Sequence, residues 1–230
     1  ATLSSSRGRK RSFVFQPDGL GGVIAAWEDS RNSEFGSCGA AANCDVFAQR
    51  VSRDGLTLWA SGGLAVEAAP GLQTLPLIGP DGAGGATVVW LDCRVAPQRD
   101  ACISGSDIYA QRVDGAGEKR WPGGAVPVSR AAGNQGEAPG VPPEQLMALA
   151  PDQMGGAIVV WPDGRNELCE GLYQFCDVYA QRVGEQLARH PWALSALVDG
   201  NGVLLSWDPP AAGNVAAYRL EVGSQPGLSD

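Results

Sequence analysis

One pattern occurs three times along the chain, and it constrains the fold more than any other feature of the sequence. Each occurrence has Pro-Asp, two variable residues and Gly-Gly, followed at a constant distance by Trp-x-Asp-x-Arg, and the three begin at Pro17, Pro80 and Pro151. The interval between the first two occurrences is slightly shorter than the interval between the last two. Recurrence at a nearly constant interval indicates a repeat architecture, in which each unit buries one face on its neighbours.

Each unit contains four short segments with the character of strands. In the first unit these are FVFQ before Pro17, VIAAW before Glu28, DVFAQRV from Asp45, and a last one around Trp59. The second segment is almost continuously apolar, as expected of a strand whose two faces are both covered. The Asp-x-x-Gly-Gly before it supplies a turn, because Gly tolerates positive φ. We therefore predict an all-β fold of three four-stranded antiparallel repeats of the kind that form propeller blades.

The combined text DGxGGxxVxWxDxR, DIYAQRVD and GxxxW resembles a family of repeats seen in large secreted bacterial proteins, over about residues 12 to 183. The resemblance implies β-propeller-type blades and an extracellular or cell-surface location, without implying one activity. The turn SRDGLTLW from Ser52 is also similar to the Asp-box of sialidase-type propellers. Its Gly, Thr and Trp are out of register with that motif, so we interpret it as a structural turn.

From Ala193 the text changes and becomes similar to the opening strands of a fibronectin type III domain. Trp207 matches the core Trp before Pro209-Pro210, and Tyr218 falls on the next strand. A whole module of this kind needs roughly 90 to 100 residues, so we expect only its first strands, in an internal piece of a longer protein. The expected organisation is an N-terminal tail at 1–11, repeats at 12–69, 70–131 and 132–189, and a partial fibronectin type III-like segment at 190–230.

Six cysteines occur as one pair in each repeat, always before the third strand. Six cysteines allow about 15 connectivities, and the repeat favours a local bridge inside each loop. Zinc is the competing interpretation, but no pair has CxxC spacing and the single histidine, His190, lies in the linker. Disulfides imply an oxidising compartment, so we expect a secreted or cell-surface protein. The predicted bridges are Cys38–Cys44, Cys93–Cys102 and Cys169–Cys176.

The bridged loops (32–44, 93–106 and 164–176) should gather on one rim of a propeller, and their sequences are the least repeated part of the chain. Variable loops on a repeated scaffold are where a specific binding surface is expected. The loop residues without counterparts in the other units, and hence the predicted binding residues, are Phe35, Arg99, Asp100, Glu167, Glu170, Tyr173 and Phe175.

Charge and motif content exclude several classes of function. The chain has 17 Lys and Arg against 25 Asp and Glu, a formal net charge of −8, which disfavours binding to nucleic acid. The basic run Arg7–Arg11 is interpreted as a solvated tail. No apolar stretch reaches the roughly 18 residues of a membrane helix, so we expect no membrane insertion. Neither a nucleotide-binding loop nor a Gly-x-Ser-x-Gly elbow is present, so no cofactor and no catalytic residues are predicted.

The aspartates and arginines that recur in each unit, such as Asp29 with Arg31 and Asp92 with Arg94, are interpreted as structural ion pairs. Calcium binding by the same aspartates is the alternative. We expect a non-catalytic binding, adhesion or structural protein that recognises a protein or glycan partner, with self-association through open blade edges as a further expectation. The alternative function is a fragment of a sialidase-like or other carbohydrate-active propeller enzyme, because a glycosidase needs only two carboxylates at a suitable separation.

Overall fold

The computed structural model describes residues 1–33, 38, 43–94, 106–121, 123–131, 135–136, 147–152, 155–163, 177–184, 192–199 and 202–208, the last two segments by their backbone alone. All regular secondary structure within these residues is β-strand. This confirms the predicted all-β class.

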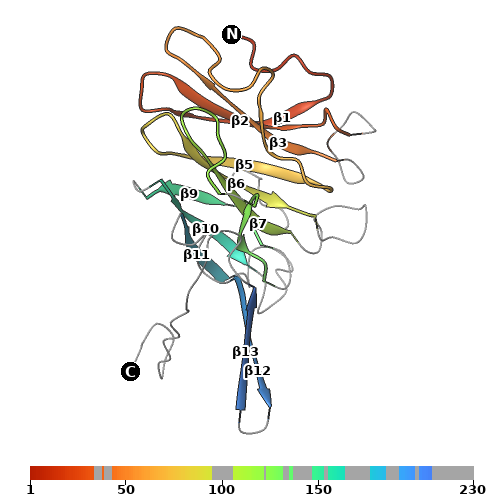
Figure 1. Ribbon diagram of the computed structural model, residues 1–230. Coiled ribbons are helices and arrows are strands. Elements are labelled where there is room, and N and C mark those ends of the chain that lie inside the picture. The colour runs from red at the N-terminus through yellow and green to blue at the C-terminus, as the bar shows by residue number, and fades with distance from the viewer. Residues whose placement is uncertain are drawn as a thin grey trace.

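Three antiparallel sheets follow one another along the chain and stack face to face (Figure 1). The first sheet has the strands β1 (Lys10–Pro17), β2 (Val23–Asp29), β3 (Asp45–Val51) and β4 (Leu64–Glu67), side by side in that order. The second sheet repeats this order with β5 (Gln73–Pro80), β6 (Ala86–Asp92), β7 (Asp107–Val113) and β8 (Val126–Ser129). In each of them, every strand is paired with its neighbour in the sequence.

The third sheet has three strands in the described part of the chain, where four were predicted. These are β9 (Ala148–Pro151), β10 (Ala157–Asp163) and β11 (Asp177–Val183), with β10 in the centre. The strands that follow, β12 (Trp192–Asp199) and β13 (Gly202–Asp208), pair with each other in a separate hairpin and not with β11. The outer edge of β11 therefore has no strand partner among the described residues.

One register holds in the central pairing of all three sheets. Each of the repeated tryptophans lies opposite an aromatic residue, in the pairs Trp27 with Phe47, Trp90 with Tyr109 and Trp161 with Tyr179. Two positions further, an aspartate that ends the second strand lies opposite the aspartate that begins the third. Equal positions in the sequence pattern therefore occupy equal positions in the three sheets.

The second sheet is buried on both faces, which explains the continuous apolar run of its second strand. Val88 and Trp90 belong to the cluster that joins it to the first sheet, whereas Val89 and Leu91 belong to the cluster that joins it to the third. All seven residues of β6 are buried. The alternation of β-strand side chains thus lets one strand serve two hydrophobic cores.

Trp27, Trp90 and Trp161 are 1%, 0% and 3% exposed, which confirms that these positions are buried. Trp90 packs against the first sheet and Trp161 against the second. The face of the first sheet that carries Trp27 has no preceding sheet in the described part of the chain. There the indole is stacked on Phe47, with ring centroids 6.5 Å apart, and lies against Gly63.

The Asp-x-x-Gly-Gly turn also fixes one sheet to the next. Asp18 accepts hydrogen bonds from the backbone N–H of Leu20 and Gly22 (2.8 and 2.7 Å), and its other oxygen accepts from Arg50 Nε at 2.9 Å. Arg50 also donates to the carbonyl of Gly115, in the turn that follows β7 of the second sheet, at 3.0 Å. Burial raises the pKa of Asp18, but these hydrogen bonds outweigh it, so the pKa is lowered. The buried carboxylate is thus stabilised in its charged form.

The first glycine of the next turn leaves room for this arginine. A Cβ on Gly84, where φ is +88°, would come within 2.5 Å of the Arg50 guanidinium. The same relation recurs one sheet later, where a Cβ on Gly155 would overlap the Arg112 guanidinium. The glycine of one unit and the arginine of the preceding unit therefore form one packing contact.

Candidate binding site

The seven loop residues that the sequence predicts as a binding surface lie outside the described residues, so their placement stays a prediction: Phe35, Arg99, Asp100, Glu167, Glu170, Tyr173 and Phe175. The disulfide Cys38–Cys44 is present, with its Cα atoms 5.3 Å apart, which confirms that pairing. Cys93 is also disulfide-bonded. Cys102, Cys169 and Cys176 lie outside the described residues.

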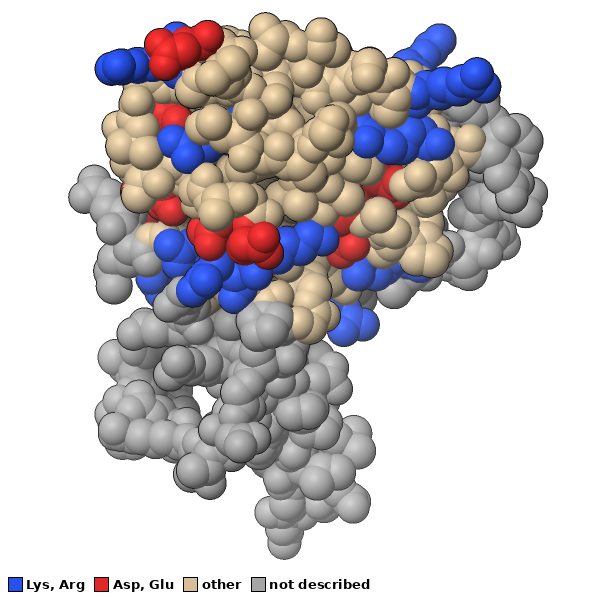
Figure 2. All heavy atoms as spheres, turned by 45° about the horizontal axis from the view of Figure 1, so that its top comes forward, with Lys and Arg blue, Asp and Glu red and all other residues tan. Residues whose placement is uncertain are grey.

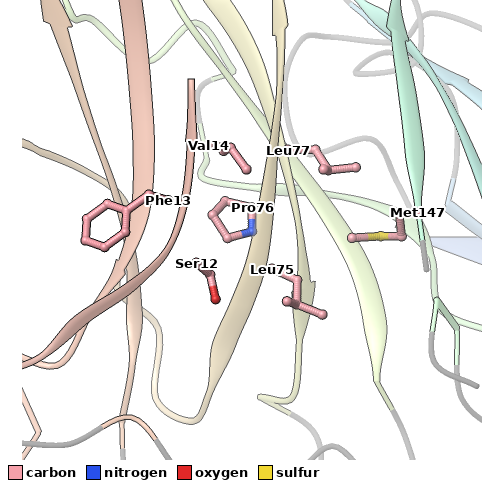
Figure 3. Close-up of a pocket in the computed structure, with 7 residues that line it drawn as sticks. All are labelled: Ser12, Phe13, Val14, Leu75, Pro76, Leu77 and Met147. Carbon is pink, nitrogen blue, oxygen red and sulfur yellow. The ribbon is translucent and has the colours of Figure 1, made fainter. Parts of the chain in front are cut away.

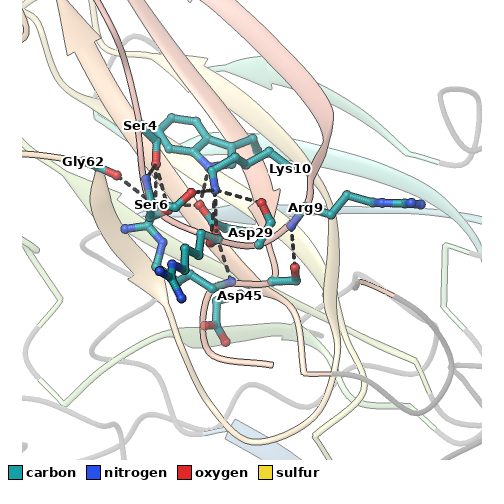
Figure 4. Close-up of polar contacts among 12 residues, drawn as sticks. Ser4, Ser6, Arg9, Lys10, Asp29, Asp45 and Gly62 are labelled. Carbon is teal, nitrogen blue, oxygen red and sulfur yellow. Dashed lines mark hydrogen bonds and ion pairs between the residues drawn. The ribbon is translucent and has the colours of Figure 1, made fainter. Parts of the chain in front are cut away.

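The recurring aspartates and arginines form structural ion pairs in the first two sheets. Asp29 accepts from Trp27 Nε1 at 3.0 Å and pairs with Arg31 Nη2 at 2.5 Å (Figure 4). Asp92 accepts from Trp90 Nε1 at 2.9 Å and pairs with Arg94 Nη2 at 2.5 Å. Burial raises the pKa of Asp29, but the hydrogen bonds from Arg31 and Trp27 outweigh it and leave the pKa lowered. These carboxylates hold the tryptophan and the following turn in place.

A hollow of about 490 Å³ opens along the first strands of the sheets (Figure 3). Met147 precedes β9 and points toward β5, while Phe13 stands on the opposite side, on β1. The lining residues are Ser12, Phe13, Val14, Leu75, Pro76, Leu77 and Met147. Phe13, Pro76 and Met147 stand at equal positions of the three repeats, each at the same distance before the Pro-Asp of its unit. The hollow is therefore formed by the same position of three neighbouring repeats.

β1 and β5, which both line the hollow, each contain a β-bulge. The register of β1 against β2 shifts between Arg11 and Val14, and that of β5 against β6 shifts between Thr74 and Leu77. Within these bulges lie the two non-glycine residues with positive φ among those described, Ser12 at +53° and Leu75 at +52°. Strained backbone of this kind costs on the order of 1–3 kcal/mol and persists where the surroundings fix it.

Glu28, on β2, holds the backbone of both bulges in place. Its side chain is fully buried, and one oxygen pairs with Arg11 Nε at 2.5 Å. The other oxygen accepts from Thr74 Oγ1 at 2.6 Å and from the backbone N–H of Leu75 at 3.1 Å. One carboxylate therefore connects both bulges across the interface of the first and second sheets. Leu91 and Pro162 occupy the equal positions of the other units, so this connection is specific to the first.

The chemistry of the hollow suits binding of an apolar group. Six of its seven lining side chains are apolar, and Ser12 supplies the single hydroxyl of the set. None of the seven is acidic or basic at neutral pH, so the set contains no general acid or base. Glu28 lies near the sulfur atoms of Cys38 and Cys44, but those are joined in the disulfide and are not free to bind a metal ion.

Sequence reasoning missed the hollow and the residues that build it. Ser12, Phe13 and Val14 differ in identity from Leu75, Pro76 and Leu77 at each of the three positions, so a comparison of the repeats gives no motif there. Glu28 could have been found, because it is the one charged residue at the variable position of the three Trp-x-Asp motifs.

A second pair of buried carboxylates lies across the strand pairing from Asp29 and Asp92. These are Asp45, opposite Asp29, and Asp107, opposite Asp92. Asp107 is 5% exposed, and burial raises its pKa to about 6, with Asp92 adding to the rise and Arg130 and Arg94 opposing it. Burial likewise raises the pKa of Asp45. A group whose pKa is raised in the folded state favours folding more as the pH falls.

We therefore predict that the contribution of Asp107 to stability increases as the pH falls through about 6 toward the unfolded pKa of 3.8. Asp107→Asn should raise the free energy of unfolding at pH 7.5 by about 1–3 kcal/mol, since one pKa unit is worth about 1.4 kcal/mol. At pH 3 the variant and the wild type should be similar. Denaturant titrations at both pH values measure this, with the exposed Asp54→Asn as the control; equal effects at the two pH values would contradict it.

On the face in Figure 2, basic and acidic side chains lie close to one another, and most of the described surface carries neither. The described part of the chain contains no helix that could span a membrane.

Comparison with known proteins gives no match, whether to family models, to curated proteins or to solved structures.

Proposed function

We propose that the chain is a secreted or cell-surface, non-catalytic binding protein built from propeller-type blades, with the hollow between its first strands as a binding site. An oxidising compartment is supported by the Cys38–Cys44 bridge. Propeller-type blades are supported by the first two sheets, in which four successive antiparallel strands lie in sequence order. A fibronectin type III-like start after the third sheet is supported by the hairpin of β12 and β13, which includes Trp207.

The observation that carries the binding function is the hollow itself. Three repeats place the same strand position around it, and the buried Glu28 connects the two bulges that shape it. The first unit alone has a carboxylate at this position, between the Trp and the Asp of the motif, because the other two units have Leu91 and Pro162 there. Specific sites break the symmetry of a repeated scaffold, and the first unit breaks it at the hollow.

The occupant that fits this lining is an apolar segment of a protein partner. A glycan site needs several polar side chains to pair with hydroxyl groups, and the described lining offers only Ser12. Phe13 is 66% exposed, so it can contact a partner without unfolding any part of the sheet. Exposed aromatic residues at the side of an apolar hollow are typical anchors of protein interfaces.

The test uses Phe13→Ala, with the neighbouring Phe15→Ala as its matched control. Phe15 is 71% exposed on the same strand but does not line the hollow, so both variants should fold as the wild type does. Against an array of peptides and glycans, we expect Phe13→Ala to lose about tenfold or more in affinity for the peptides that bind, since about 1.4 kcal/mol is tenfold. Phe15→Ala should bind as the wild type does.

The alternative activity is tested in the same samples with generic glycoside substrates. Turnover, or binding confined to glycans, would contradict the proposed function. Equal loss of binding in both variants would show that the contact is on the outer surface of β1 and not in the hollow.

A further inference from the structure

Asp-Gly pairs are the places where a protein backbone rearranges most readily without an enzyme. The glycine nitrogen can attack the carboxyl carbon of the aspartate, because glycine has no Cβ to hinder the approach. Four such pairs have both residues described, and they begin at Asp18, Asp54, Asp81 and Asp114. The surroundings of Asp54 differ from those of the other three.

The carboxylates of the other three aspartates are held by the backbone of their own turns. Asp18 Oδ1 accepts two hydrogen bonds from backbone N–H groups, at 2.8 and 2.7 Å. Asp81 Oδ1 accepts two at 2.8 and 2.9 Å, and Asp114 Oδ1 accepts two at 2.9 and 3.0 Å. The Oδ2 atom of each pairs with an arginine, at 2.9, 3.7 and 3.7 Å. Such a carboxylate cannot turn toward the glycine nitrogen until these bonds break.

Asp54 lies in the turn that follows β3, and its carboxylate has no hydrogen bond of this kind. Its one contact among the described residues is an ion pair with the exposed Arg53, with 3.8 Å between Nε and Oδ1. The side chain of Asp54 is 73% exposed, against 1%, 11% and 31% for Asp18, Asp81 and Asp114. The Asp54 carboxyl group is therefore free to rotate.

One difference between two otherwise equal turns explains this freedom. In the second unit Asp114 begins the turn, and its carboxylate accepts from the N–H groups two and four residues later. In the first unit Ser52 stands in that place, and its Oγ accepts from the N–H groups two and four residues later, both at 3.2 Å. Because the hydroxyl of Ser52 holds the turn, the carboxylate of Asp54 takes no part in it.

Gly55 presents the attacking nitrogen in open space. Its φ is +80°, and a Cβ built on it would meet nothing within 4 Å. At the equal position of the second unit, a Cβ on Gly117 would lie 2.9 Å from the Trp59 side chain. The N–H of Gly55 donates one hydrogen bond, to the carbonyl of Ser52 at 2.9 Å. One backbone hydrogen bond must therefore open at this site, whereas two to the carboxylate must open at each of the others.

We propose that Asp54–Gly55 is a site of spontaneous isoaspartate formation in the folded protein. The Gly55 nitrogen bonds to Cγ of Asp54, and a carboxyl oxygen leaves as water together with the amide proton and the carboxyl proton. A second water molecule then opens the cyclic imide. If the bond from the nitrogen to Cγ breaks, aspartate is restored. If the bond from the nitrogen to the α-carbonyl carbon breaks, the chain continues through Cγ as isoaspartate. Neither step requires an oxidant or a reductant.

The product lengthens the turn that places Trp59. Isoaspartate adds one methylene group to the backbone and leaves the α-carboxylate as a side group. The N–H of Leu58 donates to the carbonyl of Arg50 at 2.8 Å, and Trp59 Nε1 donates to the carbonyl of Gly115 at 3.2 Å. The modification thus changes a turn that leads into a contact between the first and second sheets, and its extent increases with the age of the molecule.

The first experiment follows the folded protein through weeks of incubation in mildly acidic buffer. Peptide mapping with electron-transfer fragmentation, which distinguishes isoaspartate from aspartate, quantifies the product at each pair. We expect at least about tenfold more isoaspartate at Asp54 than at Asp18, Asp81 or Asp114, since two backbone hydrogen bonds hold each of those carboxylates. Asp54→Glu is the matched control, because it keeps the exposed charge but would need a larger ring, so no such product should form there.

The second experiment repeats the incubation with the chain unfolded in guanidinium chloride and its disulfides reduced. The four pairs should then form isoaspartate at similar rates, because no turn holds any of the carboxylates. If the unfolded chain favoured Asp54 by the same factor as the folded protein, the neighbouring sequence and not the structure would select the site. Equal amounts at the four pairs of the folded protein, or none at Asp54 when the unfolded chain forms it there, would also overturn the proposal.

Discussion

Trp90→Ala is expected to lower the free energy of unfolding by about 3–5 kcal/mol, the range for deleting a large buried aromatic side chain. Trp90 is 0% exposed and packs between the first and second sheets. Its Nε1 also donates to Asp92, so the substitution removes one partner of a fully buried carboxylate. Both losses act on the same sheet interface.

The measurement is denaturant unfolding followed by far-ultraviolet circular dichroism. Leu56→Ala is the control, because Leu56 is 63% exposed and should change the stability by less than about 0.5 kcal/mol. A Trp90→Ala protein that unfolds at the wild-type midpoint would show that the first and second sheets do not depend on this contact.

Arg50→Met is expected to cost about 3 kcal/mol or more, because removing one member of a buried ion pair leaves the other charge uncompensated. Arg50 and Asp18 have side chains that are 12% and 1% exposed, with 2.9 Å between the paired atoms. The variant also loses the hydrogen bond to the Gly115 carbonyl, which joins the first sheet to the second. Methionine keeps much of the length of the side chain, so the loss reports mainly on its charge and hydrogen bonds.

Arg53→Met supplies the matched control, since Arg53 is on the same chain segment with a side chain that is 77% exposed. Its stability should stay within about 0.5 kcal/mol of the wild type, as for other exposed ion pairs. If the two variants were equally stable, the contact of Arg50 with the second sheet would be dispensable.

The sequence pattern predicted the central strands well because their register and burial are both encoded in it. The segments VIAAW, ATVVW and AIVVW became β2, β6 and β10, and the Trp in each is buried. The Cys38–Cys44 bridge followed from the placement of one pair in each loop. These features are local, so a comparison of the chain with itself is enough to find them.

Other features depended on contacts between strands and sheets, which no local pattern encodes. β1 begins at Lys10, inside the segment expected as a solvated tail, because Lys10 and Arg11 meet the buried carboxylates Asp29 and Glu28. The hollow was missed because it results from bulges in strands that come together only when the sheets stack.

The contact between the arginine of one unit and the glycine of the next affects how the protein unfolds. Because Arg50 closes on Gly84 and Arg112 on Gly155, each sheet is held in part by the one beside it. The stability of such an array approaches a sum of nearest-neighbour terms. The second sheet has a described neighbour on either side, so its amide protons should exchange more slowly than those of the first and third sheets.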